Sequence, residues 1–328
     1  VDADVLAEQW LVMNEGPGFK GWEVSFRLPN GDTCASFVPK RKGPPDNFKK
    51  SAFTDYLKGF RKANCECVEL KDEVGYVRIK LMIGAWEESD RKKIRRFLEN
   101  SQGRYKKLII DLRHNGGGSP FYTYENLIRP FLDEPLVYKQ ITGIKRKVQE
   151  DDLFVVRGGC SYEAWEMAVD EVPPPEGFDP NQWIFYEISR EVKPSDSYAF
   201  DGDMYVLMDR GSASATETYL DAVKRTGLAT LVGQRSFGGL GGYIVAPVMR
   251  LPASGMIFRM EGDLDINQDG SFIELVGVQP DVELPSCPLP DRVDRETLLK
   301  DPWIQAVING LSSPKQTCLP STSRNKNS

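Results

Sequence analysis

The feature that most restricts the fold of this chain is a buried strand that runs directly into a glycine-rich loop. Residues 106–113 read KKLIIDLR, a continuous apolar run bounded by charge, and residues 114–120 read HNGGGSP. Such runs are typical of strands buried on both faces of a parallel sheet. A second buried run, MYVLM at 204–208, leads through Gly211 into a helix that we expect to begin near Ser214. Strands that alternate with helices predict an α/β core.

The remaining segments are read from periodicity and turn residues. We expect two extended runs at 22–28 and 33–39, a basic Pro- and Gly-rich linker after them, and an irregular, polar segment over 140–203. Further strands are predicted at 67–70, 75–83, 228–233, 245–251 and 256–261, and helices at 52–62, 86–99, 121–133 and 293–311, the last with a break or restart at Pro302.

Charge and composition exclude several classes of function. The formal net charge is 42 − 48 = −6, which argues against nucleic acid or an anionic membrane as the main partner. No segment reaches the ~20 apolar residues of a membrane span. The chain has one histidine, His114, and six sparse cysteines, so we expect no histidine-rich metal site and no disulfide scaffold. Cys65 and Cys67 are interpreted as free or loosely paired thiols, and we expect neither metal nor cofactor.

The junction at 209–217 supports two interpretations. A serine at a helix start has its hydroxyl beside unpaired backbone N–H groups, and this suits a nucleophile whose oxyanion needs donors. The same sequence, with Glu217 three residues after Ser214, also fits a capping box.

The glycine loop at 114–118 is equally open on its own. Three glycines allow the backbone to approach a substrate closely, but a tight strand-to-helix turn or a phosphate-binding loop would also use them. A Walker loop requires Gly-Lys-Ser/Thr, which is absent, and the GxGxxG spacing is not met.

Taken together, four segments resemble the tail-specific, or C-terminal processing, serine proteases related to tricorn protease. In chain order they are DLRHNGGG (111–118), GSASATE (211–217), LVGQRSFGG (231–239) and GVQPD (277–281). The resemblance covers about residues 73–312. It implies an α/β fold with a crotonase/ClpP-like core of stacked strand-strand-helix units, and an activity as a serine-type endopeptidase on peptide or protein substrates.

The resemblance also implies roles for individual residues. Ser214 would be the nucleophile, and the N–H groups of Gly117 and Ala215 would form the oxyanion hole. Arg113 and Asn115 would brace the glycine loop rather than react.

The general base is where this sequence departs from the family pattern. One branch of the family uses a lysine, but Gly239 occupies that position, so we expect no Ser-Lys dyad. The tricorn-like branch uses a histidine oriented by a glutamate, for which Glu274 is the candidate, although Glu274 could also be a surface strand carboxylate. His114 is interpreted as a loop residue. We therefore expect the histidine base upstream of Val1, in sequence outside this chain, and weak or no activity of this chain alone.

The domain organisation follows from these assignments. We predict a mostly-β flank over 1–72, the end of a preceding domain plus a linker, a catalytic domain over 73–312, and a disordered tail over 313–328. Residues 119–203 would be an insertion that acts as a substrate lid, an inhibitory segment or a structural side domain.

Two further segments of the sequence allow more than one interpretation. Asp265-x-Asn267-x-Asp269-Gly270 matches the first half of a calcium loop, but position twelve is Val276, so we favour a polar hairpin turn. The alternative function is a non-catalytic ligand- or peptide-binding module on the same fold, which the missing lysine at Gly239 would fit. The sequence does not indicate compartment or oligomeric state.

Overall fold

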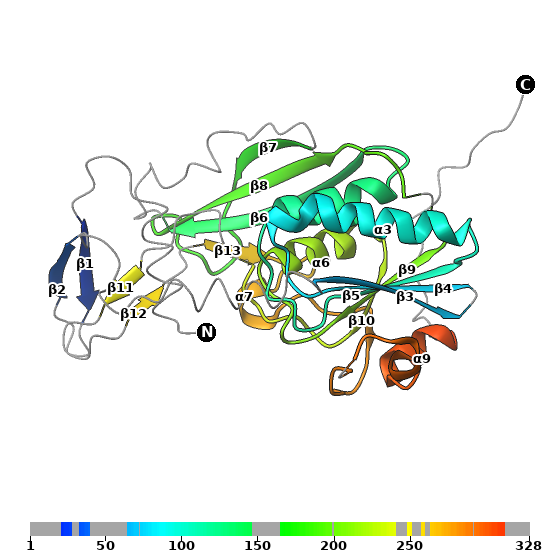
Figure 1. The fold of residues 1–328 in the computed structure, drawn as a ribbon. Coiled ribbons are helices and arrows are strands. Elements are labelled where there is room, and N and C mark those ends of the chain that lie inside the picture. Colours follow the sequence, from blue (N-terminus) through cyan, green and yellow to red (C-terminus); the bar gives the residue numbers. More distant parts are fainter. Residues whose placement is uncertain are drawn as a thin grey trace, which may run out of the picture. The chain divides into compact units, whose positions relative to one another are not determined.

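The computed structural model describes residues 21–27, 33–39, 64–145 except 72, 165–240 except 199, 248–250, 257–259 and 263–311 except 291 (Figure 1). The predicted helix at 52–62, the linker before it and the tail after Ser313 lie outside these residues. The chain divides into two compact units. The first comprises 1–63, 139–191 and 240–274, and the second comprises 64–138, 192–239 and 275–328.

A six-stranded sheet forms the centre of the second unit. Its order is β14-β10-β9-β5-β4-β3, and β4, β5, β9, β10 and β14 are parallel, whereas β3 pairs antiparallel at the edge. The strands are β3 (Cys65–Lys71), β4 (Val74–Ile79), β5 (Lys107–Asp111), β9 (Asp203–Met208), β10 (Thr230–Gly233) and β14 (Val282–Glu283). Every residue of β4 is buried, as expected for a strand covered on both faces.

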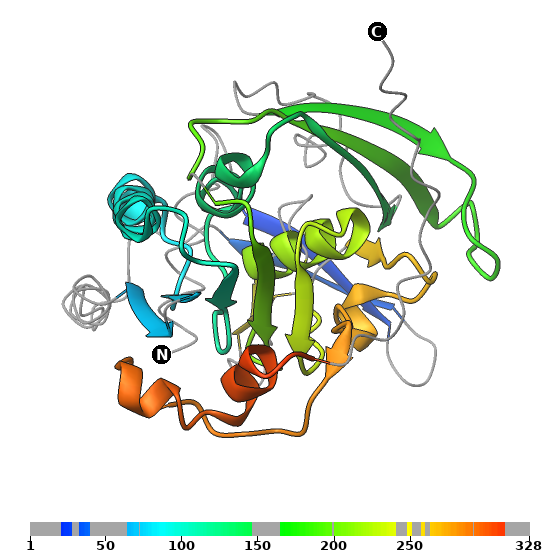
Figure 2. The same cartoon turned by 90° about the vertical axis from the view of Figure 1, so that its right-hand side faces the viewer.

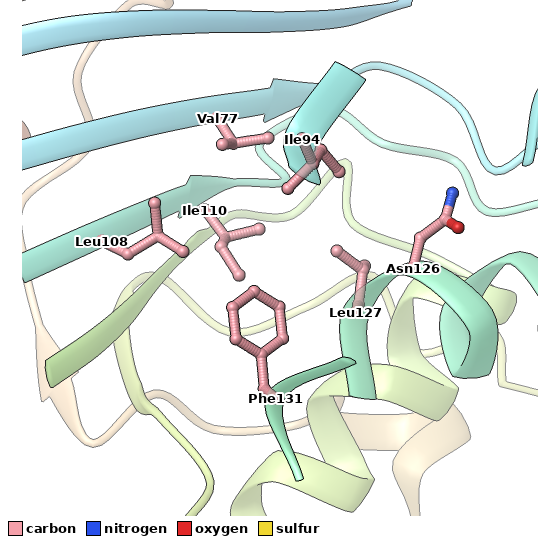
Figure 3. A pocket seen from close by; sticks show the side chains of 7 residues that line it. All are labelled: Val77, Ile94, Leu108, Ile110, Asn126, Leu127 and Phe131. Carbon is pink, nitrogen blue, oxygen red and sulfur yellow. The ribbon is translucent and has the colours of Figure 1, made fainter. Parts of the chain in front are cut away.

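Helices cover both faces of this sheet (Figures 1 and 2). On one face, Tyr76, Ile109 and Leu207 share a core cluster with Trp303 and Ile304. The opposite face carries Val77, Leu108 and Ile110, which line a small apolar pocket with Ile94, Leu127 and Phe131 (Figure 3). The helical segments of this unit are η1 (Gly84–Trp86), α3 (Glu87–Ser101), α4 (Pro120–Thr123), η2 (Tyr124–Ile128), η3 (Arg129–Phe131), α6 (Ala215–Thr226), α8 (Arg295–Leu298) and α9 (Pro302–Ile308).

Two of these helices differ in detail from the sequence prediction. The helix expected over 121–133 consists of one α turn, one π segment and one 3₁₀ turn. The closing helix is divided into α8 and α9, with Pro302 as the first residue of α9. Proline is favoured there because its missing N–H has no partner in the first turn of a helix. The predicted restart at Pro302 is confirmed.

The first unit consists mainly of strands. The hairpin of β1 (Gly21–Arg27) and β2 (Thr33–Pro39) and the pair of β11 (Val248–Arg250) and β12 (Ile257–Arg259) are both antiparallel, and their strands lie in segments predicted to be extended. A four-stranded sheet has the order β13-β6-β8-β7, with β6 (Leu136–Lys145), β7 (Trp165–Val172), β8 (Trp183–Val192) and β13 (Asp263–Ile266). A single helical turn, α7 (Ile273–Val276), begins in this unit, whose last residue is Glu274.

The prediction that 140–203 is irregular is wrong, because β7, β8 and most of β6 lie in that segment. The inner positions of these strands are partly polar, and this hides the alternation of apolar and polar residues. Buried Arg190 on β8 donates to Gln140 on β6, and Gln140 donates to Asp265 on β13. A polar network of this kind satisfies its own members but carries no hydrophobic period.

None of the described helices has the length and apolar character needed to cross a membrane.

Candidate active site

Four loops of the second unit meet at one edge of the six-stranded sheet. They follow β4, β5, β9 and β10, and the carboxyl ends of parallel strands lie at the same edge, where α/β proteins usually bind ligands. Backbone hydrogen bonds join the loops. Met82 N–H donates to Gly117 C=O at 2.9 Å, Ala213 N–H to Asn115 C=O at 3.0 Å, and Ser214 N–H to Gly239 C=O at 3.0 Å.

Ser214 occupies the turn between β9 and α6 with an unusual backbone. Its φ is 57° and its ψ is −126°, outside the left-handed helical region as well as the β and α regions. A non-glycine residue in such a conformation stores on the order of 1–3 kcal/mol of strain. Among the described side chains, none accepts a hydrogen bond from the Ser214 hydroxyl. The neighbouring Ala215 N–H also has no acceptor within the described part of the chain.

Glu217 joins the turn that carries Ser214 to the loop after β10. Its fully buried carboxylate accepts hydrogen bonds from the Ser214 N–H at 3.1 Å, the Gly238 N–H at 2.8 Å and the Gly239 N–H at 2.7 Å. The Ser236 hydroxyl donates to the same carboxylate. The bond to Ser214 is the glutamate arm of the capping box. The other three donors lie about twenty positions further along the chain, so Glu217 does more than cap a helix.

The glycine loop lies directly against Ser214. A Cβ added at Gly117 would be 2.7 Å from the Ser214 Cβ and 2.5 Å from the Ala213 carbonyl oxygen, so only glycine fits there. The Gly117 N–H donates to the Asn115 side chain at 2.9 Å. In this conformation that N–H is therefore already paired, which bears on its expected place in the oxyanion hole.

The next N–H along the loop is differently placed. Gly118 forms a parallel β-bridge with Met82. In this bridge the Met82 N–H donates to the Gly117 C=O, and the Ser119 N–H donates to the Met82 C=O. Gly118 lies between the two residues that hydrogen-bond to Met82, so its own N–H points away from Met82. A Cβ added at Gly117 would approach Ser214 and Ala215, so this loop lies against both residues. Within the described ranges, the Gly118 N–H has no acceptor.

Asn115 connects three of the four loops. Its amide donates to the Ile79 C=O at 2.9 Å, and its side-chain oxygen accepts from the Gly117 N–H and from the Thr216 hydroxyl, both at 2.9 Å. The residue is completely buried. These contacts fit the bracing role expected from the sequence.

Arg113 anchors the start of the same loop through a buried ion network. Its guanidinium donates to the Asp111 carboxylate at 2.6 Å and to Asp301 at 2.8 Å, and it lies 5.2 Å from the centre of the Trp303 ring. Tyr76 also donates to Asp111 at 2.7 Å. Burial alone would raise the pKa of Asp111, but the charge and hydrogen bonds of Arg113 outweigh it and lower that pKa. The carboxylate is thereby kept ionised.

His114 is exposed, and its imidazole lies close to the carboxylate of Asp209. Its Nδ1 lies 3.3 Å from Asp209, and its backbone N–H donates to the same side chain at 2.8 Å. The imidazole is not among the hydrogen-bond partners of Ser214 in the described structure. This placement fits the interpretation of His114 as a loop residue.

Glu274 belongs to the first unit and is described there by itself. It lies on the single turn α7, and both of its carboxylate oxygens accept from the Asp265 N–H, at 3.0 and 3.1 Å. The surface-strand interpretation of Glu274 is wrong, because the residue is in a helical turn. The segment 267–271 before it is a turn closed by Asn267 N–H to Ser271 C=O, with β13 on one side and a bridge from Ile266 to Phe272 on the other.

Comparison with known proteins identifies the family. The model of peptidase family S41 matches residues 73–284. The chain belongs to peptidase family S41. The resemblance to tail-specific serine proteases is thereby confirmed.

Individual relatives of this S41 chain are distant. A curated Chlamydia pneumoniae protein, CPj1016/CpB1054, is 25% identical over 205 residues, which are 54% of this chain and 33% of that protein. The chain thus spans about a third of the length of this relative.

Several solved structures of proteases are similar to part of this chain. The photosystem II D1 C-terminal processing protease is 19% identical, with a TM-score of 0.39 over 80% of this chain and 55% of its own. Mature CPAF is 18% identical, with a TM-score of 0.44, and the match covers 80% of this chain and 62% of the CPAF chain. Tricorn protease is 20% identical, with a TM-score of 0.38 over 88% and 22%.

Sequence reasoning on this S41 chain missed two contributors to the site. Glu217 was recognised as a cap, but its bonds to 236–239 join segments distant in sequence and leave no local signal. Asp209 was read only as part of a turn, although it accepts from the backbone N–H groups of both His114 and Gly211. Its position directly after a buried strand was the one available clue.

Proposed function

We propose that Ser214 is the nucleophile of a serine endopeptidase and that it forms an acyl-enzyme with a peptide or protein substrate. The observation that supports this best is the backbone of Ser214, with φ 57° and ψ −126° at the start of α6. A serine on a sharp, strained strand-to-helix turn is the arrangement called a nucleophile elbow. A serine that only caps a helix takes ordinary β-region angles, so capping gives no reason for the strain.

The chemistry would proceed in two steps. The Ser214 oxygen attacks the peptide carbonyl carbon, its proton passes to a general base, and the carbonyl electrons move onto the oxygen. The leaving amine takes the proton as the tetrahedral intermediate collapses to an ester. Water then attacks the ester, and Ser214 is regenerated. Each backbone N–H that holds the oxyanion contributes about 2.7–4 kcal/mol to the stability of the transition state.

For the oxyanion hole, we propose the Ala215 N–H together with an N–H of the glycine loop. Gly117 serves only if its hydrogen bond to Asn115 is released. The Gly118 N–H needs no such release, because it points away from Met82 and has no acceptor among the described residues. The N–H groups of Gly117 and Gly118 are therefore both candidates for the second donor.

The base is proposed to be a histidine from outside residues 1–328, with Glu274 as the carboxylate that orients it. Gly239 provides no lysine for a Ser-Lys dyad, and His114 pairs with Asp209. This chain alone would then be weakly active or inactive. We further propose a ClpP/crotonase-like core, a catalytic domain over 73–312, and an insertion over 119–203.

A second candidate is a non-catalytic peptide-binding module. It is favoured by one observation: no described side chain takes a hydrogen bond from the Ser214 hydroxyl, as a base would.

A fluorophosphonate probe separates the two candidates. It reacts with an activated serine, and it would be applied to residues 1–328 and to a form extended upstream. We expect labelling of the extended form that disappears in Ser214→Ala. No labelling of either form would contradict the peptidase. Labelling of 1–328 that disappears in His114→Ala would instead identify His114 as the base.

A further inference from the structure

The loop after β10 exposes a large aromatic ring beside the nucleophile turn. Phe237 is 63% exposed, and it is one of four large apolar side chains exposed in the described part of the chain; the others are Phe121, Val137 and Leu275. A phenyl ring left in water forgoes the burial that normally stabilises it. Single exposed apolar residues are common, so exposure alone decides nothing.

The backbone that carries this ring is fixed at consecutive positions. The Phe237 N–H donates to the Ser212 C=O at 2.9 Å, and the next two N–H groups donate to Glu217. Ser236, on the other side, is held by Glu217 and by a bond from its N–H to the Val278 C=O at 3.0 Å. Because the loop is anchored so densely, the Cα of Phe237 cannot withdraw and the ring stays presented to solvent.

The ring is also tied to the nucleophile by a short path. A Cβ added at Gly239 would be 3.1 Å from the Phe237 Cδ1, so the ring lies over Gly239. The carbonyl of Gly239 accepts the Ser214 N–H at 3.0 Å. Gly239 thus leaves room for the phenyl ring, and a larger residue at this position would compete with the ring for that space.

We infer that Phe237 forms one wall of a substrate subsite, which takes an apolar side chain next to the scissile peptide bond. This inference rests on the proposed function, since it gives the acyl acceptor Ser214 a preferred substrate class. Aromatic rings provide a large contact area at low cost in conformational entropy, which suits a fixed recognition surface. Burial of one apolar side chain against such a ring changes affinity by about 10-fold to 100-fold.

The test uses the upstream-extended protein and two peptides that differ only by leucine or serine beside the cleaved bond. Phe237→Ala should lower kcat/KM about 10-fold to 100-fold for the leucine peptide and change the serine peptide less than 3-fold. Phe237→Leu should keep most of the preference. Phe121→Ala, the matched loss of an exposed phenyl ring, should leave it unchanged.

Two controls keep failure of this inference apart from failure of the peptidase. Fluorophosphonate labelling of Phe237→Ala at the parent rate shows that the nucleophile is intact. If the parent is not labelled at all, fluorescence anisotropy with the same peptides and Ser214→Ala measures the preference by binding alone. Equal losses for both peptides, or no loss for either, would overturn the assignment of Phe237.

Discussion

The strand-to-helix junctions after β5 and after β9 solve the same problem in different ways. Both leave neighbouring parallel strands, and each contains one non-glycine residue at φ 57°, His114 in the first and Ser214 in the second. Histidine is among the residue types that are enriched at positive φ. Serine is not, and the ψ of −126° at Ser214 lies outside the left-handed helical region as well. A positive φ is therefore less costly at His114 than at Ser214.

The two junctions also differ in what holds them. Arg113, Asp111 and Asp301 anchor the β5 junction through a buried ion network. The β9 junction depends on Glu217, whose carboxylate accepts only neutral donors from the backbone and Ser236. The loop after β5 is therefore anchored by charge, whereas the loop that carries Ser214 is anchored by hydrogen bonds around a strained turn.

The largest effect is expected at the charged junction. Arg113→Met leaves the carboxylates of Asp111 and Asp301 buried without their cation, and loss of one partner from a buried ion pair costs about 3–5 kcal/mol. Urea unfolding followed by circular dichroism measures this loss. Lys300→Met, which removes an exposed ion pair with Glu296, should leave stability nearly unchanged. Equal effects of the two substitutions would show that the network does not anchor the junction.

The next effect is expected at the β9 junction. Glu217→Gln replaces one acceptor oxygen by an NH₂ group that faces N–H or O–H donors, and each buried donor left unpaired costs about 1–3 kcal/mol. We expect a loss of stability in that range and slower fluorophosphonate labelling of the extended protein, since the loop 236–239 would loosen. Glu296→Gln, at an exposed site, is the control. Labelling at the parent rate would mean that Glu217 supports the fold but not the nucleophile turn.

The sequence predicts those parts of the two junctions whose structure is determined by neighbouring residues. The strands β5 and β9 and the helix α6 were predicted because continuous apolar runs and helical periods are written in adjacent residues. The order of the family motifs also identified Ser214, Gly117 and Asn115 as one site, and the structure places these three together.

The missed features depend on contacts between segments far apart in the chain. The strands β6, β7 and β8 went unseen because Arg190, Gln140 and Asp265 occupy inner positions and hydrogen-bond to one another. The backbone angles of Ser214 and the bond from Gly117 to Asn115 arise from tertiary packing. No propensity of Ser-Ala-Ser-Ala-Thr-Glu indicates a φ of 57°.

The pH dependence of stability provides a third comparison. Arg113 lowers the pKa of Asp111, so this carboxylate stabilises the fold above its unfolded pKa of about 3.9 and loses that contribution as the pH falls through its folded pKa. Asp111→Asn should therefore be less stable than the parent at pH 7, and the difference should shrink below about pH 4. Thermal unfolding from pH 7 to pH 2 measures it. A difference that does not vary with pH would contradict an ionised Asp111 in the folded state.

The smallest effect distinguishes the two residues at φ 57°. Ser214→Gly removes the strain at a cost in unfolded-chain entropy, so we expect a net gain of about 0.5–1 kcal/mol, whereas Ser214→Ala should gain nothing because alanine has the same backbone penalty. His114→Gly should gain less, since histidine tolerates positive φ better. Both Ser214 variants should lose fluorophosphonate labelling in the extended protein, while His114→Gly keeps it. Thermal unfolding measures the gain in stability of each glycine variant, and labelling reports whether the serine still reacts. Equal gains in stability for Ser214→Gly and His114→Gly would contradict the strain assigned to Ser214.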